Sequence, residues 1–298
     1  MTRRKLFEAS NRLRLRGGGI VMVLTITVLT AGISAAPPAQ DKKLTLEELI
    51  ARHTESIGSA EARAAARSRV VKGTISLAFR VGGAGSGSGS GTLVSLGTKV
   101  RYGMKFNSIE YTGEDLAFDG KHAATGFLPR GGRSQLSTLL SIREAPLKEG
   151  LLGSVLSTAW PLLRIEEQNP KLEYRGLKKI DGREMHELSY RPRKGDSDLK
   201  IALYFDAETF RHIRTRYSLK IEARIGTRES PNENPESYYS LTEDFDDFRA
   251  VDGLMLPHKY RLQVSVQGNL ASSLYDYTLA VNSISHKEAI DDRVFTLK

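Results

Sequence analysis

The sequence predicts a mainly β protein in which antiparallel strands with one apolar face form a sheet that a few helices cover. The stretch 199–225 places mostly apolar residues at every second position from Ile213 to Ile225. A period of two over this length is typical of a strand with one buried and one solvated face. The same period recurs through most of the chain after residue 70, between tight-turn pairs such as Asp181-Gly182 and Asp252-Gly253. Short turns between strands favour antiparallel neighbours.

The N-terminal 36 residues have the three parts of a secretory signal peptide. A basic start precedes an apolar run at 20–33, and small residues follow. This run is shorter than the about 20 apolar residues that cross a bilayer. We therefore expect export to the periplasm with cleavage near Ala35, the alternative being an uncleaved N-terminal anchor. Residues 37–43 are predicted to form a flexible leader and 44–298 a single domain.

Charge and cysteine content limit the partners of the protein. Six of the basic residues lie in the first 36 positions with one glutamate, so more than half of the formal charge of +9 belongs to the predicted signal peptide. The rest of the chain is only mildly basic, which does not indicate a nucleic-acid-binding protein. The absence of cysteine means that an exported chain depends on its core rather than on disulfides, and that it cannot carry a lipidated cysteine.

Three segments have helical spacing. Residues 44–57 place apolar side chains on one helical face, and Thr45 with Glu48 forms a capping-box pattern that begins the helix, while Gly58 ends it. The leucine-rich segments 134–142 and 148–163 follow in the middle of the chain. They are predicted to be two further helices that cover the apolar face of the sheet.

The low-complexity stretch 82–91 reads GGAGSGSGSG. The spacing of its glycines fits neither a dinucleotide-binding loop nor a P-loop, and no helix follows. We therefore interpret it as a flexible hairpin loop or a glycine-rich strand at a sheet edge.

Strand patterns alone leave three arrangements open. A closed barrel would enclose its own apolar face, a two-sheet sandwich would pair two such faces, and a single curved sheet would hold helices in its concavity. The predicted helices are long enough to cover about half of the face of a curved sheet. An uncovered remainder would be a large apolar patch, which soluble proteins keep mainly for binding.

No pattern in the sequence indicates catalysis or a bound metal. The six histidines are far apart and none has metal-binding spacing. The acidic cluster at 243–247 lacks the spacing of a calcium loop and is predicted to be a solvated strand end. A G-x-S-x-G elbow and a thiol nucleophile are both absent. We expect neither an enzyme nor a cofactor.

Three segments resemble the LolA/LolB-like outer-membrane lipoprotein-sorting proteins. Residues 174–183 and 203–210 (LYFDAETF) are similar to the repeated hairpins of that family, and 244–258, with VDGLMLPH, is similar to a later strand pair. The similarity spans 44–298 through turn and strand signatures of low specificity. It implies an unclosed β half-barrel with helices on its concave side, a periplasmic location and a cavity for acyl chains.

These observations together predict a monomeric periplasmic carrier that binds lipid acyl chains or lipoproteins. The alternative is an interaction or sensor module that binds a peptide or a membrane-associated regulator with the same sheet. In the hairpin at 199–225, the arginines at 214, 216 and 224 should lie on the outside. The predicted apolar cavity lining consists of Ile213, Tyr217, Leu219, Ile221, Ile225, Tyr260, Leu262, Val264, Leu139, Leu152, Val155 and Trp160.

Overall fold

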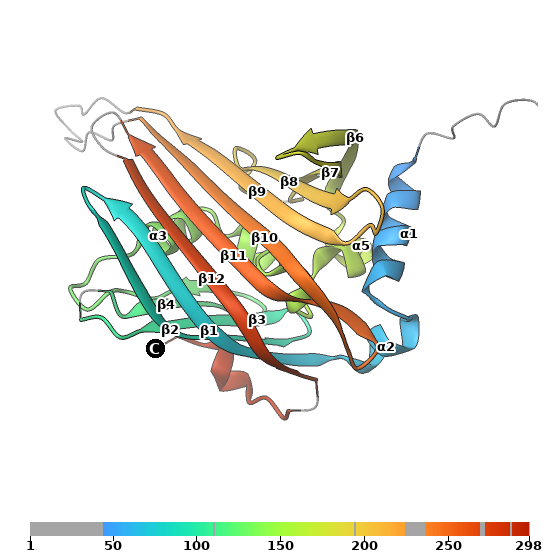
Figure 1. The fold of residues 1–298 in the computed structure, drawn as a ribbon, viewed down its shortest axis with the longest axis horizontal. Helices are drawn as coiled ribbons and strands as arrows, with labels where there is room; N and C mark the ends of the chain where they lie inside the picture. Colours follow the sequence, from blue (N-terminus) through green and yellow to red (C-terminus); the bar gives the residue numbers. More distant parts are fainter. Residues whose placement is uncertain are drawn as a thin grey trace, which may run out of the picture. The chain divides into compact units, whose positions relative to one another are not determined.

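Twelve antiparallel strands in the described part of the chain form one continuous sheet (Figure 1). The computed structural model describes residues 44–109, 111–193, 195–223, 236–268, 272–286 and 288–297. The predicted signal peptide and leader, together with Arg224 and Ile225, lie outside these residues. The strands are β1 (Ser68–Val81), β2 (Ala84–Leu96), β3 (Lys99–Phe106), β4 (Gly113–Phe118), β5 (Ala123–Thr125), β6 (Lys171–Ile180), β7 (Arg183–Arg191), β8 (Lys200–Asp206), β9 (His212–Ile221), β10 (Ser237–Val251), β11 (Leu254–Gly268) and β12 (Ser272–Ser285).

The sheet is not closed. Its strand order is β5-β4-β3-β2-β1-β12-β11-β10-β9-β8-β7-β6, so β5 and β6 are the two edges. The first strand pairs with the last one in the middle of the sheet, where Val70 lies opposite Ser285 and Val81 opposite Ser273. The sheet thus consists of two meanders that meet at β1 and β12. This confirms the prediction of a curved, unclosed half-barrel with helices on its concave face.

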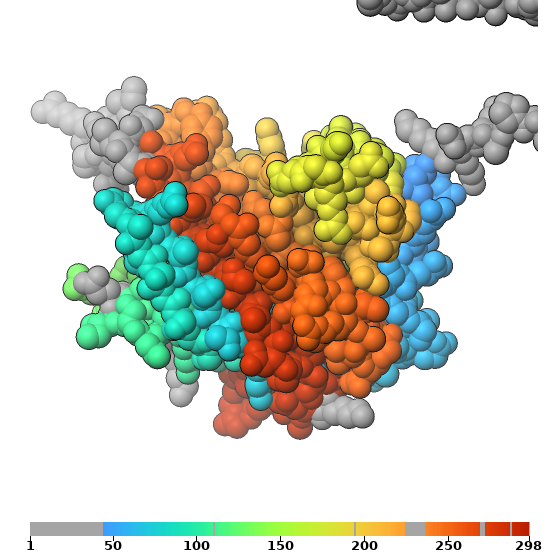
Figure 2. All heavy atoms as spheres, viewed as in Figure 1, coloured from blue at the N-terminus to red at the C-terminus, as the bar shows by residue number. Residues whose placement is uncertain are grey.

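The chain crosses from one edge of the sheet to the other through residues 126–170. This crossing contains α3 (Gln135–Ile142), α4 (Ala145–Lys148), the 3₁₀ turns η1 (Ser154–Leu156) and η2 (Pro161–Leu163), and α5 (Ile165–Gln168). We call 134–163 the plug, because its leucines join the core formed by the inner face of the sheet. Figure 1 shows α3 behind the strands, and in the space-filling view of the same side the strands hide the plug (Figure 2).

The N-terminal helix α1 (Leu46–Ile57) is built as its sequence predicts. The Thr45 side chain accepts from the backbone N–H of Glu48, and the Glu48 carboxylate accepts from that of Thr45, which completes the capping box. Gly58 ends the helix with φ of 146°, a conformation that favours glycine. The short helix α2 (Ala60–Ala65) follows, and η3 (Asp292–Phe295) is the last element of the chain.

The predicted helix at 148–163 is wrong. Only two single 3₁₀ turns occur there, separated by irregular backbone. Gly150 and Gly153 adopt φ of 70° and 74°, which a continuous right-handed helix does not allow. A Cβ at Gly150 would lie 2.2 Å from the carbonyl oxygen of Ala159, so the close approach of these two segments also requires glycine. The spacing of the leucines correctly indicated that these side chains are buried. It did not indicate the backbone conformation of the segment.

The glycine–serine stretch is not a loop, and it is not at an edge. Most of it belongs to β2, which lies between β1 and β3. Alternate glycines make room for large side chains of β1 and β12. A Cβ at Gly85 would lie 2.2 Å from the Phe79 ring, and one at Gly91 would lie 2.6 Å from Leu279.

A β-bulge in β9 changes which residues share a face. Tyr204 lies opposite Arg214 but Phe205 lies opposite His212, so Ile213 is the extra residue. A bulge shifts the alternation of all residues before it. Ile213 therefore packs in a small separate cluster with Met185 and Tyr204, and not with the main core as the alternation predicts. His212, on the polar side of the sequence pattern, is buried at 1% exposure.

Candidate functional site

The interior of the half-barrel is largely filled. A void of about 20 Å³ lies among side chains of β1, β2, β3, β11 and β12 and is lined by Leu93, Tyr102, Tyr260 and Leu262, among others. This volume accommodates about one water molecule and is far too small for an acyl chain. The plug leucines and Trp160 occupy the concavity instead, each less than 4% exposed except Leu163.

The irregular part of the plug is held by polar side chains of the sheet. A buried backbone without regular structure leaves N–H and C=O groups that need partners. Tyr102 donates to the carbonyl of Leu152, and Arg69 donates to that of Val155. The backbone N–H of Thr158 donates to the hydroxyl of Ser95 over 3.0 Å. These contacts explain why polar residues of β1, β2 and β3 are buried.

Glu243 on β10 is the central anchor of the plug. Its carboxylate is completely buried and accepts hydrogen bonds from the N–H of Gly153 (2.7 Å), from Tyr217 (2.7 Å) and from Tyr260 (2.8 Å). Burial raises the pKa of Glu243 to about 7, although the three hydrogen bonds act in the opposite direction. The prediction that the acidic cluster is a solvated strand end is therefore wrong for this residue. Its neighbour Asp244 faces outward and binds Arg214.

A second buried carboxylate, Glu114 on β4, anchors α3. It accepts from Ser137 of α3 over 2.7 Å, and from Tyr111 and from Tyr277 (3.2 Å). Burial raises its pKa as well. The first helix of the plug and its irregular part are thus each joined to the sheet through a glutamate that two tyrosines also contact. Nothing in the local sequence distinguishes Glu114 or Glu243 from surface glutamates, except that each lies in phase with apolar residues of its strand.

His53 and His212 are buried and hydrogen-bonded in the interior. His53 accepts from the indole N–H of Trp160 at Nε2 (2.9 Å), so its proton is on Nδ1, which donates to the carbonyl of Phe210 (3.0 Å). Burial lowers the pKa of His53 to about 4. His212 lies 2.6 Å from the hydroxyl of Ser154 in the plug, and burial holds its pKa well below the ordinary value.

The structure brings together most residues of the predicted cavity lining. Ile221 is half-buried, Ile213 lies in the separate cluster, and Ile225 is outside the described residues. The others form one packed core and do not surround an open cavity; their contact with an acyl chain stays a prediction. These residues are Leu139, Leu152, Val155, Trp160, Tyr217, Leu219, Tyr260, Leu262 and Val264.

Among the residues that the structure describes, none of the plug covers one end of the inner face of the sheet. There the inward-facing side chains of β1 and β9–β12 extend past the residues that pack against the plug, and they remain half-buried or exposed. Phe79 lies opposite Tyr275, and Tyr239 opposite Val266, so these side chains are neighbours across adjacent strands. We call this set the apolar rim; it consists of Phe79, Val81, Ile221, Tyr239, Val266 and Tyr275.

Aromatic rings contact one another where the apolar rim crosses β1 and β12. Phe79 stacks on Tyr275 with ring centroids 6.1 Å apart, and Tyr111 stacks on the same ring at 6.2 Å. Val81, at the tip of β1, is 48% exposed. The predicted cavity lining includes only Ile221 of this set. The others could have been found by following the strand alternation beyond the length that the plug can cover.

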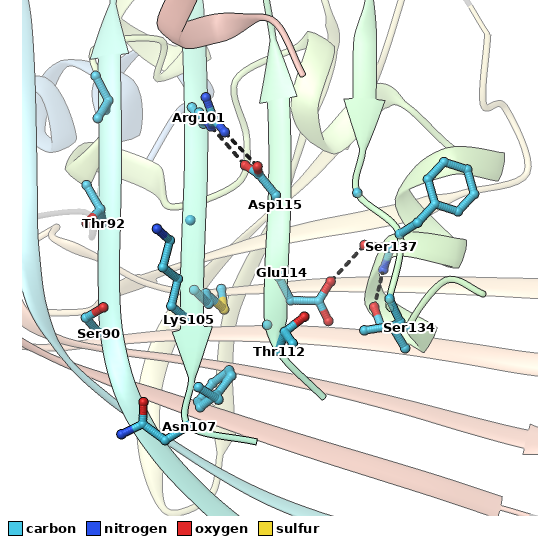
Figure 3. A pocket seen from close by; sticks show the side chains of 18 of the residues that line it. Ser90, Thr92, Arg101, Lys105, Asn107, Thr112, Glu114, Asp115, Ser134 and Ser137 are labelled. Atoms are coloured by element: carbon cyan, nitrogen blue, oxygen red, sulfur yellow. Dashed lines mark hydrogen bonds and ion pairs between the residues drawn. The ribbon is translucent and has the colours of Figure 1, made fainter. Parts of the chain in front are cut away.

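A polar pocket of about 750 Å³ lies along β2, β3 and β4 (Figure 3). Ser90 lies opposite Lys105, and Thr92 lies opposite Gly103. Because Gly103 has no side chain, it leaves a depression between the side chains of β2 and β4. Arg101 is paired with Asp115 through two hydrogen bonds of 2.9 and 2.6 Å. Arg101 and Asp115 therefore compensate each other's charge, and Glu114, which also lines this pocket, accepts the hydrogen bond from Ser137.

Within the described ranges, no group of three or more histidine, aspartate or glutamate side chains is placed to hold a metal ion. No helix in those ranges is both long and apolar enough to span a bilayer.

Comparison with known proteins finds structural similarity only. No protein-family model and no curated protein match the sequence. The chain is similar to the structure of a LolA superfamily protein from Nitrosomonas europaea, with 11% identity over 85% of this chain and 98% of that one and a TM-score of 0.43. It is also similar to a putative outer membrane lipoprotein-sorting protein domain from Vibrio parahaemolyticus (12% identity, 83% and 97% covered, TM-score 0.44). A DUF1329 family protein from Desulfovibrio piger matches at 11% identity, with 84% and 96% covered and a TM-score of 0.39. The similarity is therefore to LolA-superfamily and lipoprotein-sorting structures, at a level that transfers no function to this chain.

Proposed function

We propose that this protein is a non-enzymatic periplasmic carrier that binds the acyl chain of a lipid or lipoprotein on the apolar rim. The observation that supports the proposal is the uneven cover of the inner face. Where the plug packs on the inner face, the side chains of the sheet are buried. At the ends of the five adjacent strands β1 and β9–β12, the apolar side chains of the same face are half-exposed. Apolar surface of this kind on a soluble domain is characteristic of a binding site.

The physical driving force for such binding is the removal of methylene groups from water. Each buried CH₂ contributes about 0.8 kcal/mol, so even a partial contact of about eight methylenes contributes about 6 kcal/mol before the entropy of association is subtracted. The aromatic rings of Phe79, Tyr239 and Tyr275 offer large, rigid contact areas. Entry of the chain deeper into the half-barrel would require displacement of the plug, which the contacts of Glu243 and Glu114 oppose.

A matched pair of neighbouring tyrosines tests the proposal. Tyr239 belongs to the apolar rim, while Tyr238 is 46% exposed on the opposite face of the same strand. We expect Tyr239→Ser to weaken the binding of a fluorescent fatty acid by about tenfold, which corresponds to about 1.4 kcal/mol. Tyr238→Ser should leave the affinity unchanged. Circular dichroism of both variants checks that the fold is retained.

Native mass spectrometry of the mature protein supplies the second readout. Copurified or added lipid should be retained by the wild type and lost from Tyr239→Ser. Equal affinities in the two tyrosine variants, together with no retained lipid, would refute the proposal. Displacement of the probe by an apolar peptide but not by fatty acids would instead support the alternative of a peptide-binding sensor module.

A further inference from the structure

A second pocket lies at the opposite end of β1 from the apolar rim. It has a volume of about 800 Å³ and is formed by the end of α1, α2, the β2–β3 turn and the η2–α5 segment. Because β1 has 14 residues, the two sites are separated by about 40 Å along this strand. We call it the arginine pocket, since Arg63, Arg67 and Arg164 line it.

Positive charge is concentrated in the arginine pocket. Glu167 is the acidic residue in its lining, so the pocket has an excess of two positive charges. Arg164 is paired with Glu167, with 3.1 Å between Nε and Oε2. Arg67 is exposed, and its guanidinium makes no hydrogen bond or ion pair with any residue that the structure describes. Like charges held together destabilise a fold unless an anion is bound between them.

Two of the three guanidinium groups are already held in place. Arg63 donates through Nη1 to the carbonyl of Thr54 (3.1 Å) and to that of Gly58, at the end of α1. Arg164 is held by Glu167. Side chains that are fixed before a ligand arrives lose less conformational entropy on binding. The N–H groups of a guanidinium match the oxygens of phosphate and carboxylate groups.

Charge and polarity together indicate the class of ligand. A phosphomonoester has a charge of about −1.5 to −2 at pH 7, which matches the excess of two positive charges better than the single charge of a carboxylate does. Leu96, Leu162 and Leu163 also line the pocket, and Leu163 is 36% exposed, so an apolar body can lie beside the charged group. We propose that the arginine pocket binds the phosphate of a phosphomonoester, in a lipid head group or in a soluble compound.

The experiment uses the mature protein at low ionic strength and two kinds of probe. Glycerol 3-phosphate is titrated by calorimetry, and vesicles of phosphatidylcholine with or without phosphatidic acid are tested by co-sedimentation. Binding of glycerol 3-phosphate supports a soluble ligand, and binding only of phosphatidic-acid vesicles supports a lipid head group. Equal binding to both kinds of vesicle, or no binding in either assay, would overturn the proposal.

Three variants locate the site. Arg67→Gln should lower the affinity at least fivefold, while Arg80→Gln, an exposed arginine at the other end of β1, should have no effect. Ala64→Trp fills the pocket without changing its charge and should also weaken binding. Equal losses in Arg67→Gln and Arg80→Gln would show nonspecific attraction and refute the assignment. Tyr239→Ser should retain phosphate binding. Phosphate binding in the arginine pocket can therefore be observed even if the acyl-chain proposal fails.

Discussion

The backbone N–H of Gly153 in the plug donates a 2.7 Å hydrogen bond to the completely buried carboxylate of Glu243 on the sheet. An ionised carboxylate accepts hydrogen bonds only, so it can receive Gly153 and two tyrosine hydroxyls at once. The same group therefore fixes an irregular backbone segment and three strands of the sheet. Its burial without a cation makes the stability of the protein sensitive to pH.

Glu243→Gln should flatten part of the pH dependence of stability. The pKa of Glu243 rises from 4.5 to about 7 on folding, so between these values the folded protein retains a proton that the unfolded chain has lost. Stability from this group is therefore present below pH 4.5 and lost as the pH rises to 7. We expect the wild type to lose about 3 kcal/mol more than the variant over this range, measured by urea denaturation. The exposed Glu208→Gln is the control, and parallel profiles for wild type and Glu243→Gln would contradict the prediction.

His53→Gln should remove a pH dependence of the opposite sign. The pKa of His53 falls from 6.5 to about 4 on folding, so below pH 6.5 the unfolded chain takes up a proton that the folded protein refuses. Acidification from pH 6.5 to 4 should thus destabilise the wild type by about 3 kcal/mol more than the variant. Trp160 is the only tryptophan of the chain and contacts His53, so its fluorescence reports the transition. A wild-type midpoint that acid shifts no more than that of the variant would refute the role of His53.

Two glycines of β2 should respond differently to the same substitution. A Cβ at Gly89 would lie 1.8 Å from the backbone oxygen of Lys105, whereas one at Gly87 would lie 3.8 Å from the Phe106 ring. We expect Gly89→Ala to destabilise the protein by more than about 2 kcal/mol, because the backbone of β3 must move. Gly87→Ala should be neutral or slightly stabilising, since the methyl group only makes ordinary contact. Thermal unfolding of both variants gives the comparison, and a Gly89→Ala midpoint as high as that of Gly87→Ala would contradict it.

Salt should separate the two proposed sites. Contacts on the apolar rim are with uncharged side chains, so the affinity for a fatty-acid probe should change little between 50 and 200 mM NaCl. Binding of phosphate in the arginine pocket should weaken several-fold over the same range, because added ions screen the guanidinium groups. The two titrations are made on one preparation of protein. A fatty-acid affinity that falls as steeply as the phosphate affinity would indicate binding of the probe by its carboxylate.

Much of the fold could be predicted because its information is local. The capping residues of α1 and the alternation within strands depend on neighbours in the sequence, and both were predicted correctly. The half-barrel was chosen among three arrangements only through the family resemblance. Strand patterns by themselves do not show whether the two edge strands of a sheet pair with each other and close it into a barrel.

The errors concern properties that distant residues decide. The part of the plug at 149–163 can be irregular because side chains such as Glu243 and Tyr102 supply hydrogen-bond partners for its backbone. The leucines of this segment do not indicate that such partners exist elsewhere in the chain. The bulge at Ile213 moves that residue to the other face without any local mark in the sequence. Glycines of β2 are required by Phe79 and Leu279 on other strands. Most residues of the apolar rim were not predicted, because the sequence does not show how much of the inner face the plug covers.

The pairing of β1 with β12 also constrains when the protein can fold. Residues at the two ends of the described chain must meet before the middle of the sheet exists, as the pair Val70 and Ser285 shows. Until β12 has emerged, β1 has an open edge on the side where β12 will pair. Contacts this distant in sequence form slowly. The middle of the sheet therefore cannot be completed until the last strand of the chain has been synthesised.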